Sequence, residues 1–314
     1  MSDLVSLPAD FNPDLTLCGG QAFRWTPIAA APSAAAYQGV VGDAVLTVVR
    51  ADHGNWQVRL LNHPPTPTWR RRICAYFDLD RDYRAAHHLV VERLRRLSGT
   101  AAWTPTTDPL GAFFNQLAGL RLLRQPWFET LVSFVVSANN HLPRIRQIID
   151  IISRTFGQPL GDDHYAFPTP EALAAADPAT LRTVCRVGYR DRYLSRLAQQ
   201  ISRDRRFWEH AATLPTAALR QALRTLPGVG PKVAECVLLF GFHRWEAFPV
   251  DVWVRRALAI LLGDPSPPSP AADRRRIAAV AATLGSVAGL AQQYLFELMR
   301  RRLITGSLSG NHRV

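Results

Sequence analysis

The sequence predicts an α+β protein that is mostly helical, with an antiparallel β-sheet at its N-terminus. Up to about residue 62 of the 314, short segments rich in β-branched and aromatic residues are separated by turn signals such as Gly42-Asp43. From about residue 69 onward, apolar residues recur at helical spacing. We therefore expect an N-terminal sheet region, 1–68, followed by a helical region, 69–314.

Each expected element has its own local signal. The strands end at turns or at the Pro-rich linker Asn62–Trp69, and the helices are punctuated by proline and glycine. The segment Gln125–Asn140 is apolar nearly all round, so it should run through the core. The expected strands are Ala22–Ile28, Tyr37–Val41, Ala44–Val49 and Trp56–Leu61, with a turn at Asp52-His53-Gly54, and the main expected helices are Trp69–Phe77, Tyr83–Leu97, about 110–120, Val252–Leu262 and Ala288–Leu303, with a loop at Ser266–Pro270.

Composition narrows the partner and the compartment. A formal net charge of +12 favours a polyanion, with nucleic acid ahead of a membrane surface, and no apolar run reaches the roughly 18 residues of a membrane span. The N-terminus lacks a secretory pattern, so we expect a cytoplasmic protein, or a nuclear one in a eukaryote. The dispersed histidines and cysteines form no metal motif, and reduced thiols are expected at Cys18, Cys74, Cys185 and Cys236.

The stretch Leu226–Pro231 (LPGVGP) predicts a sharp turn between two helices, in a hairpin over about 216–241. We expect Gly228 and Gly230 to supply backbone conformations that a Cβ would resist. Pro231 suits the first turn of the second helix, where its missing N–H costs nothing. Bare amides at such a helix start attract a phosphate.

Lys232 follows this turn and is the only lysine among the 37 lysine and arginine residues. Arginine cannot lose its proton near neutrality or form a Schiff base, whereas a lysine amine can do both. Asp251 stands just ahead of another helical run. The alternatives are a solvated lysine in a first helical turn and an ordinary N-cap aspartate.

This run resembles the helix–hairpin–helix and Gly/Pro-Asp signature of the HhH-GPD DNA glycosylase superfamily. Lys232 with Asp251 resembles its bifunctional glycosylase/AP-lyase members, and the motifs elsewhere are most similar to those of 8-oxoguanine DNA glycosylases. The resemblance implies a mostly α-helical HhH-GPD fold and a base-excision repair enzyme, here expected as a monomer on damaged double-stranded DNA. Relatives with an iron–sulfur cluster carry four grouped cysteines after the catalytic Asp. None follows Asp251, so we expect no iron–sulfur cluster and no required cofactor.

The resemblance also implies a pocket for the flipped base. The element Cys18–Trp25 (CGGQAFRW) matches one in which a glycine carbonyl accepts the proton at N7 of oxidised guanine, here Gly20. Gln292 would bond the Watson–Crick edge and Phe296 would stack on the base, with Cys236 as the opposite wall. Taken singly, Gly20 also fits the entry to a strand, and Phe296 fits a core position.

Contacts to the DNA strands are implied in the same way. Asn139 would fill the hole left by the extruded base, and Arg144 would bond the orphaned cytosine. Tyr189 would wedge into the duplex, with Arg190 supporting the estranged cytosine. The alternatives are a helix C-cap for Asn139, a solvated charge for Arg144 and an inward-packed Tyr189.

Some positions depart from the family pattern. His141 stands where some relatives have a third Asn, Trp253 where they often have a histidine near phosphate, and Phe240 where a methionine is seen; Pro143 is an additional constraint. These departures leave the contact to the opposite base open.

Relatives also hold a monovalent cation on hairpin carbonyls. Here those would belong to Arg224, Leu226 and Val229. The hairpin glycines, Gly228 and Gly230, would lie along the DNA with Val229.

Two other functions remain open. Alkylpurine excision shares the hairpin and Asp251 but normally lacks the lysine. A noncatalytic helix–hairpin–helix module would bind DNA through its basic surface alone.

Overall fold

The computed structural model describes residues 3–31, 34–51, 55–98, 109–263 and 269–304. By their packing these fall into two compact units. Unit 1 comprises residues 1–81 and 120–244, and unit 2 comprises residues 82–119 and 245–314. The expected turn at Asp52-His53-Gly54 and most of the loop Ser266–Pro270 lie outside the described residues. No helix among the described residues is both long and apolar enough to cross a membrane.

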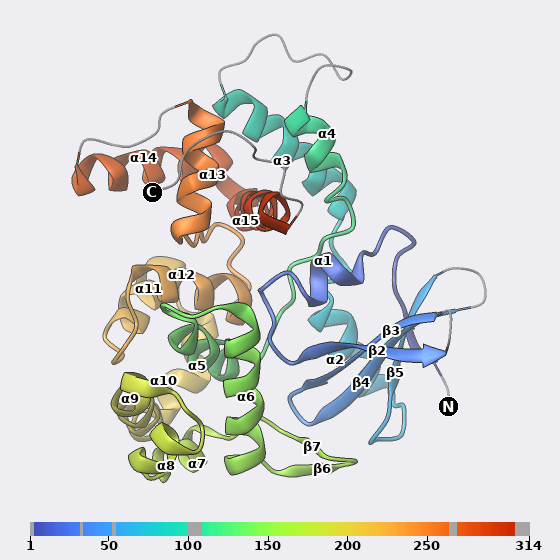
Figure 1. Ribbon diagram of the computed structural model, residues 1–314, viewed down its shortest axis with the longest axis vertical. Coiled ribbons are helices and arrows are strands. Elements are labelled where there is room, and N and C mark those ends of the chain that lie inside the picture. The colour runs from blue at the N-terminus through green and yellow to red at the C-terminus, as the bar shows by residue number, and fades with distance from the viewer. Residues whose placement is uncertain (1–2, 32–33, 52–54, 99–108, 264–268, 305–314) are drawn as a thin grey trace. The chain divides into compact units, whose positions relative to one another are not determined.

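Unit 1 contains the predicted antiparallel sheet, with five strands in the order β1-β5-β4-β3-β2 (Figure 1). All four expected strands are confirmed. The short β1, which pairs with β5, had no alternation long enough to predict it. Gly39 of β3 is required because a Cβ there would lie 2.4 Å from the Trp25 ring of β2. The strands are β1 (Asp3–Ser6), β2 (Trp25–Ala31), β3 (Ala34–Val41), β4 (Ala44–Arg50) and β5 (Trp56–Leu60).

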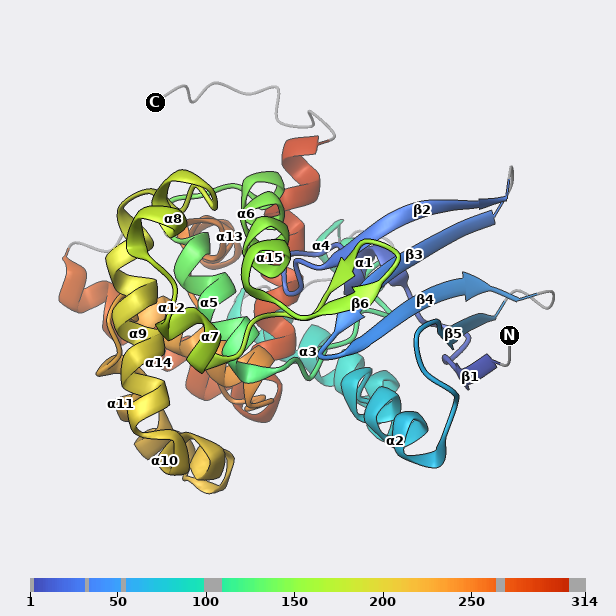
Figure 2. The same cartoon turned by 90° about the horizontal axis from the view of Figure 1, so that it is seen from below.

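One face of this sheet is covered by α2 (Pro67–Tyr76), which is begun by the Thr66 cap (Figure 2). Ile73, Tyr76 and Phe77 enter the same apolar core as Trp25, and the Trp25 indole donates to the Tyr76 hydroxyl at 2.8 Å. Each large apolar side chain buried in this way stabilises the fold by about 1.5–3 kcal/mol. This shared core holds α2 packed on the sheet as a second layer.

The centre of the helical part of unit 1 is α5 (Trp127–Ser137), buried along most of its length as its composition predicts. A two-stranded hairpin, β6 (Pro159–Gly161) with β7 (His164–Tyr165), follows α6 (Leu142–Phe156) and was not predicted, because the sequence indicates a helical region over 69–314. Its strands are too short for a period-2 pattern. The remaining helices of this part are α1 (Pro13–Leu17), α7 (Pro170–Ala174), α8 (Pro178–Thr183), α9 (Asp191–Arg203) and α10 (Arg205–His210), with short 3₁₀ turns η1 (Gly188–Arg190) and η2 (Ala211–Thr213).

The predicted hairpin consists of α11 (Thr216–Arg224) and α12 (Pro231–Cys236). The second helix does not continue as a regular α-helix, because Val237–Gly241 forms a π-helical turn, η3. Both α12 and η3 pack on α5. A π turn inside a helix often marks a functional region.

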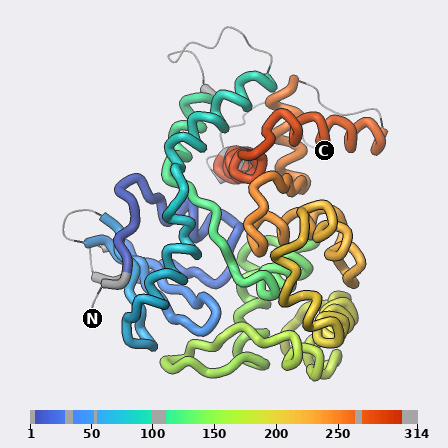
Figure 3. The backbone as a smooth tube through the Cα atoms, turned by 180° about the vertical axis from the view of Figure 1, so that it is seen from behind, coloured from blue at the N-terminus to red at the C-terminus, as the bar shows by residue number. Residues whose placement is uncertain are grey.

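Unit 2 is helical and is assembled from two separated stretches of chain. In it α3 (Tyr83–Leu97) lies beside α15 (Ala288–Ile304), as the tube view shows (Figure 3). The predicted helices at 83–97, 252–262 and 288–303 are confirmed. The other elements of this unit are α4 (Pro109–Asn115), α13 (Val252–Leu262), α14 (Pro270–Leu284) and η4 (Gly285–Val287).

Candidate functional site

The hairpin turn has one constrained glycine, not two. Gly228 has φ +79°, and a Cβ there would lie 3.1 Å from the Tyr193 Cβ. Gly230 has φ −84° and ψ −179°, an extended conformation open to any residue, and nothing lies within 4 Å of its Cβ position. The prediction that Gly230 needs a special backbone conformation is therefore wrong, because the turn is completed by Gly228 alone. The open space at Gly230 leaves the main chain accessible.

Pro231 begins α12 at its first turn, as predicted, and Gly230 caps it without a side-chain hydrogen bond. The first amides of a helix have no partner within it, so those of α12 are left for an external acceptor. Arg220 of α11 pairs with Glu235 of α12 and holds the two helices of the hairpin together.

Lys232 is half-buried in the first turn of α12. Its Nζ donates to the Ser137 Oγ at 3.1 Å and lies 4.9 Å from the centroid of the Phe134 ring. No described carboxylate of unit 1 forms an ion pair with it. A lysine here also meets the positive end of the helix dipole. The amine is thus held by one hydroxyl and one aromatic face, so the alternative of a freely solvated lysine does not describe it.

A cavity of about 360 Å³ opens beside the hairpin, lined by Gly228, Val229 and Gly230 and by two tyrosines. Tyr189 is 56% exposed and Tyr193 is 43% exposed, and their rings meet edge to face at 6.3 Å. The alternative that Tyr189 packs inward is excluded. Two exposed aromatic faces beside bare amides form a surface suited to bases and phosphates.

Arg190, next to Tyr189, is only 7% exposed. Its guanidinium donates to the carbonyl of Ala138, which follows α5, and to the carbonyl of Val187 at 3.2 Å. It also lies 4.4 Å from the Tyr189 ring centroid. The side chain therefore ties the tyrosine turn to the end of α5.

After α5, Asn139 is exposed and His141 caps the next helix, α6. Asn139 has φ +52° and an exposed side chain, so it continues the chain beyond the helix in the left-handed conformation. His141 caps α6, its Nδ1 accepting from the Arg144 N–H at 3.4 Å. The Arg144 guanidinium donates to Gln147 and to the carbonyl of Arg186, at 3.1 and 3.3 Å. The histidine at position 141 thus serves as a helix cap, as an asparagine could.

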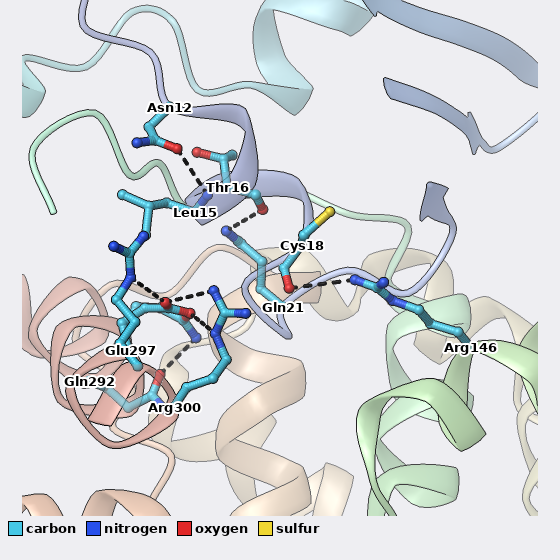
Figure 4. Close-up of polar contacts among 11 residues, drawn as sticks. Asn12, Leu15, Thr16, Cys18, Gln21, Arg146, Gln292, Glu297 and Arg300 are labelled. Carbon is cyan, nitrogen blue, oxygen red and sulfur yellow. Dashed lines mark hydrogen bonds and ion pairs between the residues drawn. The ribbon is translucent and has the colours of Figure 1, made fainter. Parts of the chain in front are cut away.

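The Gly20 loop precedes β2. Gly20 has φ +83°, and the chain is held on both sides of it. Figure 4 shows Arg146 reaching the Cys18 carbonyl and Gln21 reaching that of Thr16, at 3.4 and 2.9 Å. Cys236, the predicted wall of the base pocket, is buried in α12 at 2% exposure.

In unit 2, Asp251 caps α13. Its Oδ1 accepts from the N–H groups of Trp253 and Val254 at 2.9 and 2.8 Å. The capping alternative is therefore confirmed as a structural role, and it leaves Oδ2 for other partners. The Trp253 ring lies 5.1 Å from the guanidinium carbon of Arg256.

Gln292 and Phe296 lie one turn apart on α15, which packs against α13. Gln292 is buried and its Oε1 accepts from Gln293 at 3.1 Å, whereas Phe296 is half-buried. The residue after Phe296, Glu297, is fully buried and paired with Arg300 at 2.8 Å (Figure 4). In unit 2, the Asp251 carboxylate therefore lies at the start of α13, and the Gln292 amide and Phe296 ring lie on the adjacent helix α15.

The four cysteines carry no disulfide. Among the described residues, no group of three or more His, Cys, Asp or Glu side chains could hold a metal ion.

Comparison with known proteins gives a family match for the sheet-containing N-terminal part and for the helical part that follows it. Residues 4–131, which include the sheet, match the model of the 8-oxoguanine DNA glycosylase N-terminal domain, and residues 132–282 match that of the HhH-GPD superfamily base excision DNA repair proteins. A probable N-glycosylase/DNA lyase of Methanothermobacter thermautotrophicus is 30% identical over 275 residues, 81% of this chain and 82% of that protein. The chain belongs to the N-glycosylase/DNA lyase family.

Solved structures of this family superpose along nearly the whole chain. MBOgg1 in complex with a low-affinity DNA ligand gives a TM-score of 0.79 at 32% identity, covering 95% of this chain and 94% of its own. The Clostridium acetobutylicum 8-oxoguanine glycosylase/lyase in complex with double-stranded DNA containing cytosine opposite 8-oxoG gives 0.78 at 30% identity, covering 94% and 93%.

Sequence reasoning missed several residues of this glycosylase/lyase site. Ser137 was visible only as a serine ending an apolar helix, and nothing local indicated that it would meet Lys232. Tyr193 lies four residues after Tyr189, and a spacing of four, which brings side chains together on a helix, could have indicated an aromatic pair. Gln21 and Gln125 lie within the stretches Cys18–Trp25 and Gln125–Asn140, but no local pattern predicts a role for either side chain.

Proposed function

We propose that this protein excises 8-oxoguanine from duplex DNA and then cleaves the strand through a Schiff base at Lys232. The observation that carries the proposal is the placement of the only lysine: at the hairpin, above Phe134, with a hydroxyl and no unit 1 carboxylate as its polar partner. The Clostridium relative whose structure contains DNA with cytosine opposite 8-oxoG supports the choice of lesion.

The reaction divides into two covalent steps. The amine of Lys232, after losing a proton, attacks C1′ of the nucleotide, and the bond from C1′ to the base breaks with its electrons leaving on the base. Asp251 stabilises the positive charge that develops on the sugar and serves as the proton acceptor. The C1′–O4′ bond then breaks and O4′ takes up a proton, so the sugar ring opens and C1′ becomes doubly bonded to the lysine nitrogen as a Schiff base. This Schiff base acidifies the hydrogens at C2′, and loss of one of them expels the 3′ phosphate by β-elimination.

Four residues are assigned to recognition of the base. The Gly20 carbonyl accepts from the N7–H that 8-oxoguanine has and guanine lacks, which is a discrimination by one hydrogen bond. Gln292 bonds the Watson–Crick edge, and Phe296 and Cys236 stack on the two faces. The exposed Tyr189 wedges into the duplex and Asn139 fills the gap, while Arg144 bonds the unpaired cytosine. The buried Arg190 supports that cytosine by holding the Tyr189 turn in place.

The hairpin supplies the contact to the DNA backbone and a site for a cation. The exposed Gly228 and Gly230 present N–H groups that can donate to a phosphate oxygen, while the buried Val229 holds the turn between them through its N–H bond to the Leu226 carbonyl. The carbonyl of Arg224 lies at the end of α11, where helix carbonyls have no partner within the helix, and that of Leu226 accepts from the Val229 N–H at 3.1 Å, which leaves it a second lone pair. With Val229 they fit a monovalent cation, which would supply positive charge beside the phosphate. We propose no other cofactor and no iron–sulfur cluster.

Borohydride trapping tests the proposal directly. Incubation with a duplex containing 8-oxoguanine opposite cytosine should give a covalent protein–DNA adduct, because reduction converts a Schiff base into a stable amine. The only side-chain amine in the sequence is that of Lys232, so the Lys232→Gln variant should give no adduct. A trapped Lys232→Gln protein would overturn the assignment of the nucleophile.

The same assay separates the alternatives. An alkylpurine glycosylase would release 3-methyladenine without an adduct, and a binding module would retain DNA without releasing any base. Sedimentation of the complex with one duplex should show a single protein chain, which is the monomer we propose. With DNA as substrate, the protein would act in the cytoplasm, or in the nucleus of a eukaryote.

A further inference from the structure

We propose that Gln125 is a positioning residue that sets the distance between the Gly20 carbonyl and the amine of Lys232. The inference rests on the proposed function, in which the first group reads the lesion and the second attacks C1′ of the same nucleotide. Both groups lie in unit 1, and two separate sets of contacts join them.

The first contacts hold the residue that follows Gly20. Gln21 is fully buried, and all three of the hydrogen bonds of its side chain go to the main chain. Its Nε2 donates to the carbonyls of Thr16 and Arg121 at 2.9 and 2.7 Å, and its Oε1 accepts from the Leu123 N–H at 2.9 Å. A buried amide satisfied in this way cannot rotate without losing several bonds. The Gly20 loop is therefore locked to the segment that leads into α5.

Gln125, at the end of that segment, makes the connection to the helix of Lys232. Its side-chain Nε2 donates to the Gln21 carbonyl at 2.7 Å, and its main-chain N–H donates to the Phe240 carbonyl at 2.9 Å. Phe240 lies in the π-helical turn η3, which directly continues α12. One residue thus joins the peptide after Gly20 to the helix that carries the nucleophile.

The second route consists of aromatic rings. Phe23, three residues after Gly20, meets Phe134 edge to face at 5.5 Å. Phe134 in turn stacks on Phe240 at 5.4 Å and carries the Lys232 amine on its face. Because interiors are close-packed, a shift of the Gly20 loop along this route must displace a ring that also positions the amine.

Removal of the Gln125 side chain should affect the Gly20 loop and the Lys232 amine differently. Lys232 also bonds to Ser137 of α5, so it keeps its place when the side chain of Gln125 is removed. The Gln21 carbonyl would lose its side-chain donor, so the peptide after Gly20 could shift relative to α12 although the Gln21 side chain still holds it to the segment before α5. Recognition of the base should suffer, whereas β-elimination at an abasic site should not, because an abasic site has no base to recognise.

Single-turnover kinetics of the full-length Gln125→Leu variant test this directly. One duplex carries 8-oxoguanine opposite cytosine and the other a preformed abasic site opposite cytosine. We expect base excision to slow about tenfold or more, since small misplacements of reacting groups are costly, and β-elimination to stay within about twofold of the parent. The control is Gln199→Leu, at an exposed position whose side chain makes one weak bond to Ser195 at 3.4 Å; both rates should remain at the parental values.

A parallel fall of both rates, tracking a loss of folded protein, would mean that Gln125 is only structural and would overturn the inference, as would two unchanged rates. If Gln125→Leu does not fold, Gln125→Met decides, since its unbranched side chain has nearly the length of glutamine but no N–H group for the Gln21 carbonyl, and it should show the same imbalance between the two rates. If the parent protein neither excises 8-oxoguanine nor forms an adduct, the proposed function is refuted. That outcome differs from an active parent whose Gln125→Leu variant changes both rates equally, which refutes only the role of Gln125.

Discussion

Lys232 in unit 1 and Asp251 in unit 2 are held in opposite ways. The amine has one hydroxyl partner, Ser137, and an aromatic face beneath it. The carboxylate accepts two main-chain N–H groups at the start of α13. A helix N-terminus favours a negative charge and disfavours a positive one, so α13 stabilises its charged group whereas α12 does not.

This difference matches the two tasks proposed for them. A nucleophile must leave its resting contacts to form a covalent bond, so few and weak contacts suit Lys232. A group that stabilises charge must stay in place while the charge develops, and hydrogen bonds to a rigid helix end serve Asp251 well. We therefore expect substitutions around Lys232 and substitutions at Asp251 to differ in whether a loss of reaction rate is accompanied by a loss of stability.

The largest effect is expected at Asp251. Asp251→Asn should keep the helix cap, because an amide oxygen can also accept the two N–H groups, yet it removes the charge. We expect base excision to fall about 100- to 1,000-fold with little change in melting temperature. Asp251→Ala should show the same loss of rate and a further destabilisation of about 1 kcal/mol. Excision rates and urea denaturation measure the two effects, and a fully active Asp251→Asn protein would show that the charge has no role.

The hairpin that presents Lys232 provides a matched pair of glycines. Gly228→Ala should lower the free energy of unfolding by about 2 kcal/mol, because the left-handed backbone and the contact with Tyr193 both resist a Cβ. Gly230→Ala should change it by less than about 0.5 kcal/mol, while weakening DNA binding by crowding the main chain. Urea denaturation and a DNA titration distinguish them, and equal destabilisation would contradict the turn geometry.

A smaller effect is expected at Ser137, whose hydroxyl accepts from the Lys232 amine. Ser137→Ala removes a hydrogen bond worth about 1 kcal/mol, so the rate of adduct formation should fall about fivefold while the melting temperature changes little. Ser137→Thr keeps the hydroxyl and should retain most of the rate. If Ser137→Ala reacts as fast as the parent, this contact does not position Lys232.

The smallest effect concerns the pH dependence of the unit that carries Asp251. Burial lowers the pKa of His87 below 6.5, and its Nδ1 lies 2.7 Å from the Tyr294 hydroxyl. Between that lowered pKa and 6.5 the unfolded chain binds more protons than the folded one, so stability should fall as the pH falls through this window. For a half-exposed histidine we expect a few tenths of a kcal/mol. Urea midpoints from pH 7.5 to 5.5 should be flatter for His87→Gln, and an equal flattening by His88→Gln would contradict this assignment.

Much of the architecture could be read from local patterns. The four longer strands, α5 as a buried helix, the hairpin and the cap at Asp251 each depend on residues within one or two turns of each other. The π-helical turn at Val237–Gly241 could not be predicted in this way, because it is stabilised by the distant Gln125 N–H. Likewise, the short β1 exists only because β5 pairs with it.

The candidate site divides along the same line. A lysine among arginines marks the one side chain able to form a Schiff base, and this chemical property needs no fold to recognise it. Which groups surround that amine is a matter of long-range packing: Phe134 and Ser137 lie about a hundred positions earlier in the chain, and Arg190 proves to be bonded to the carbonyl of Ala138. Residue type sets the reaction a side chain can perform, whereas its partners are chosen by contacts that no short stretch of sequence contains.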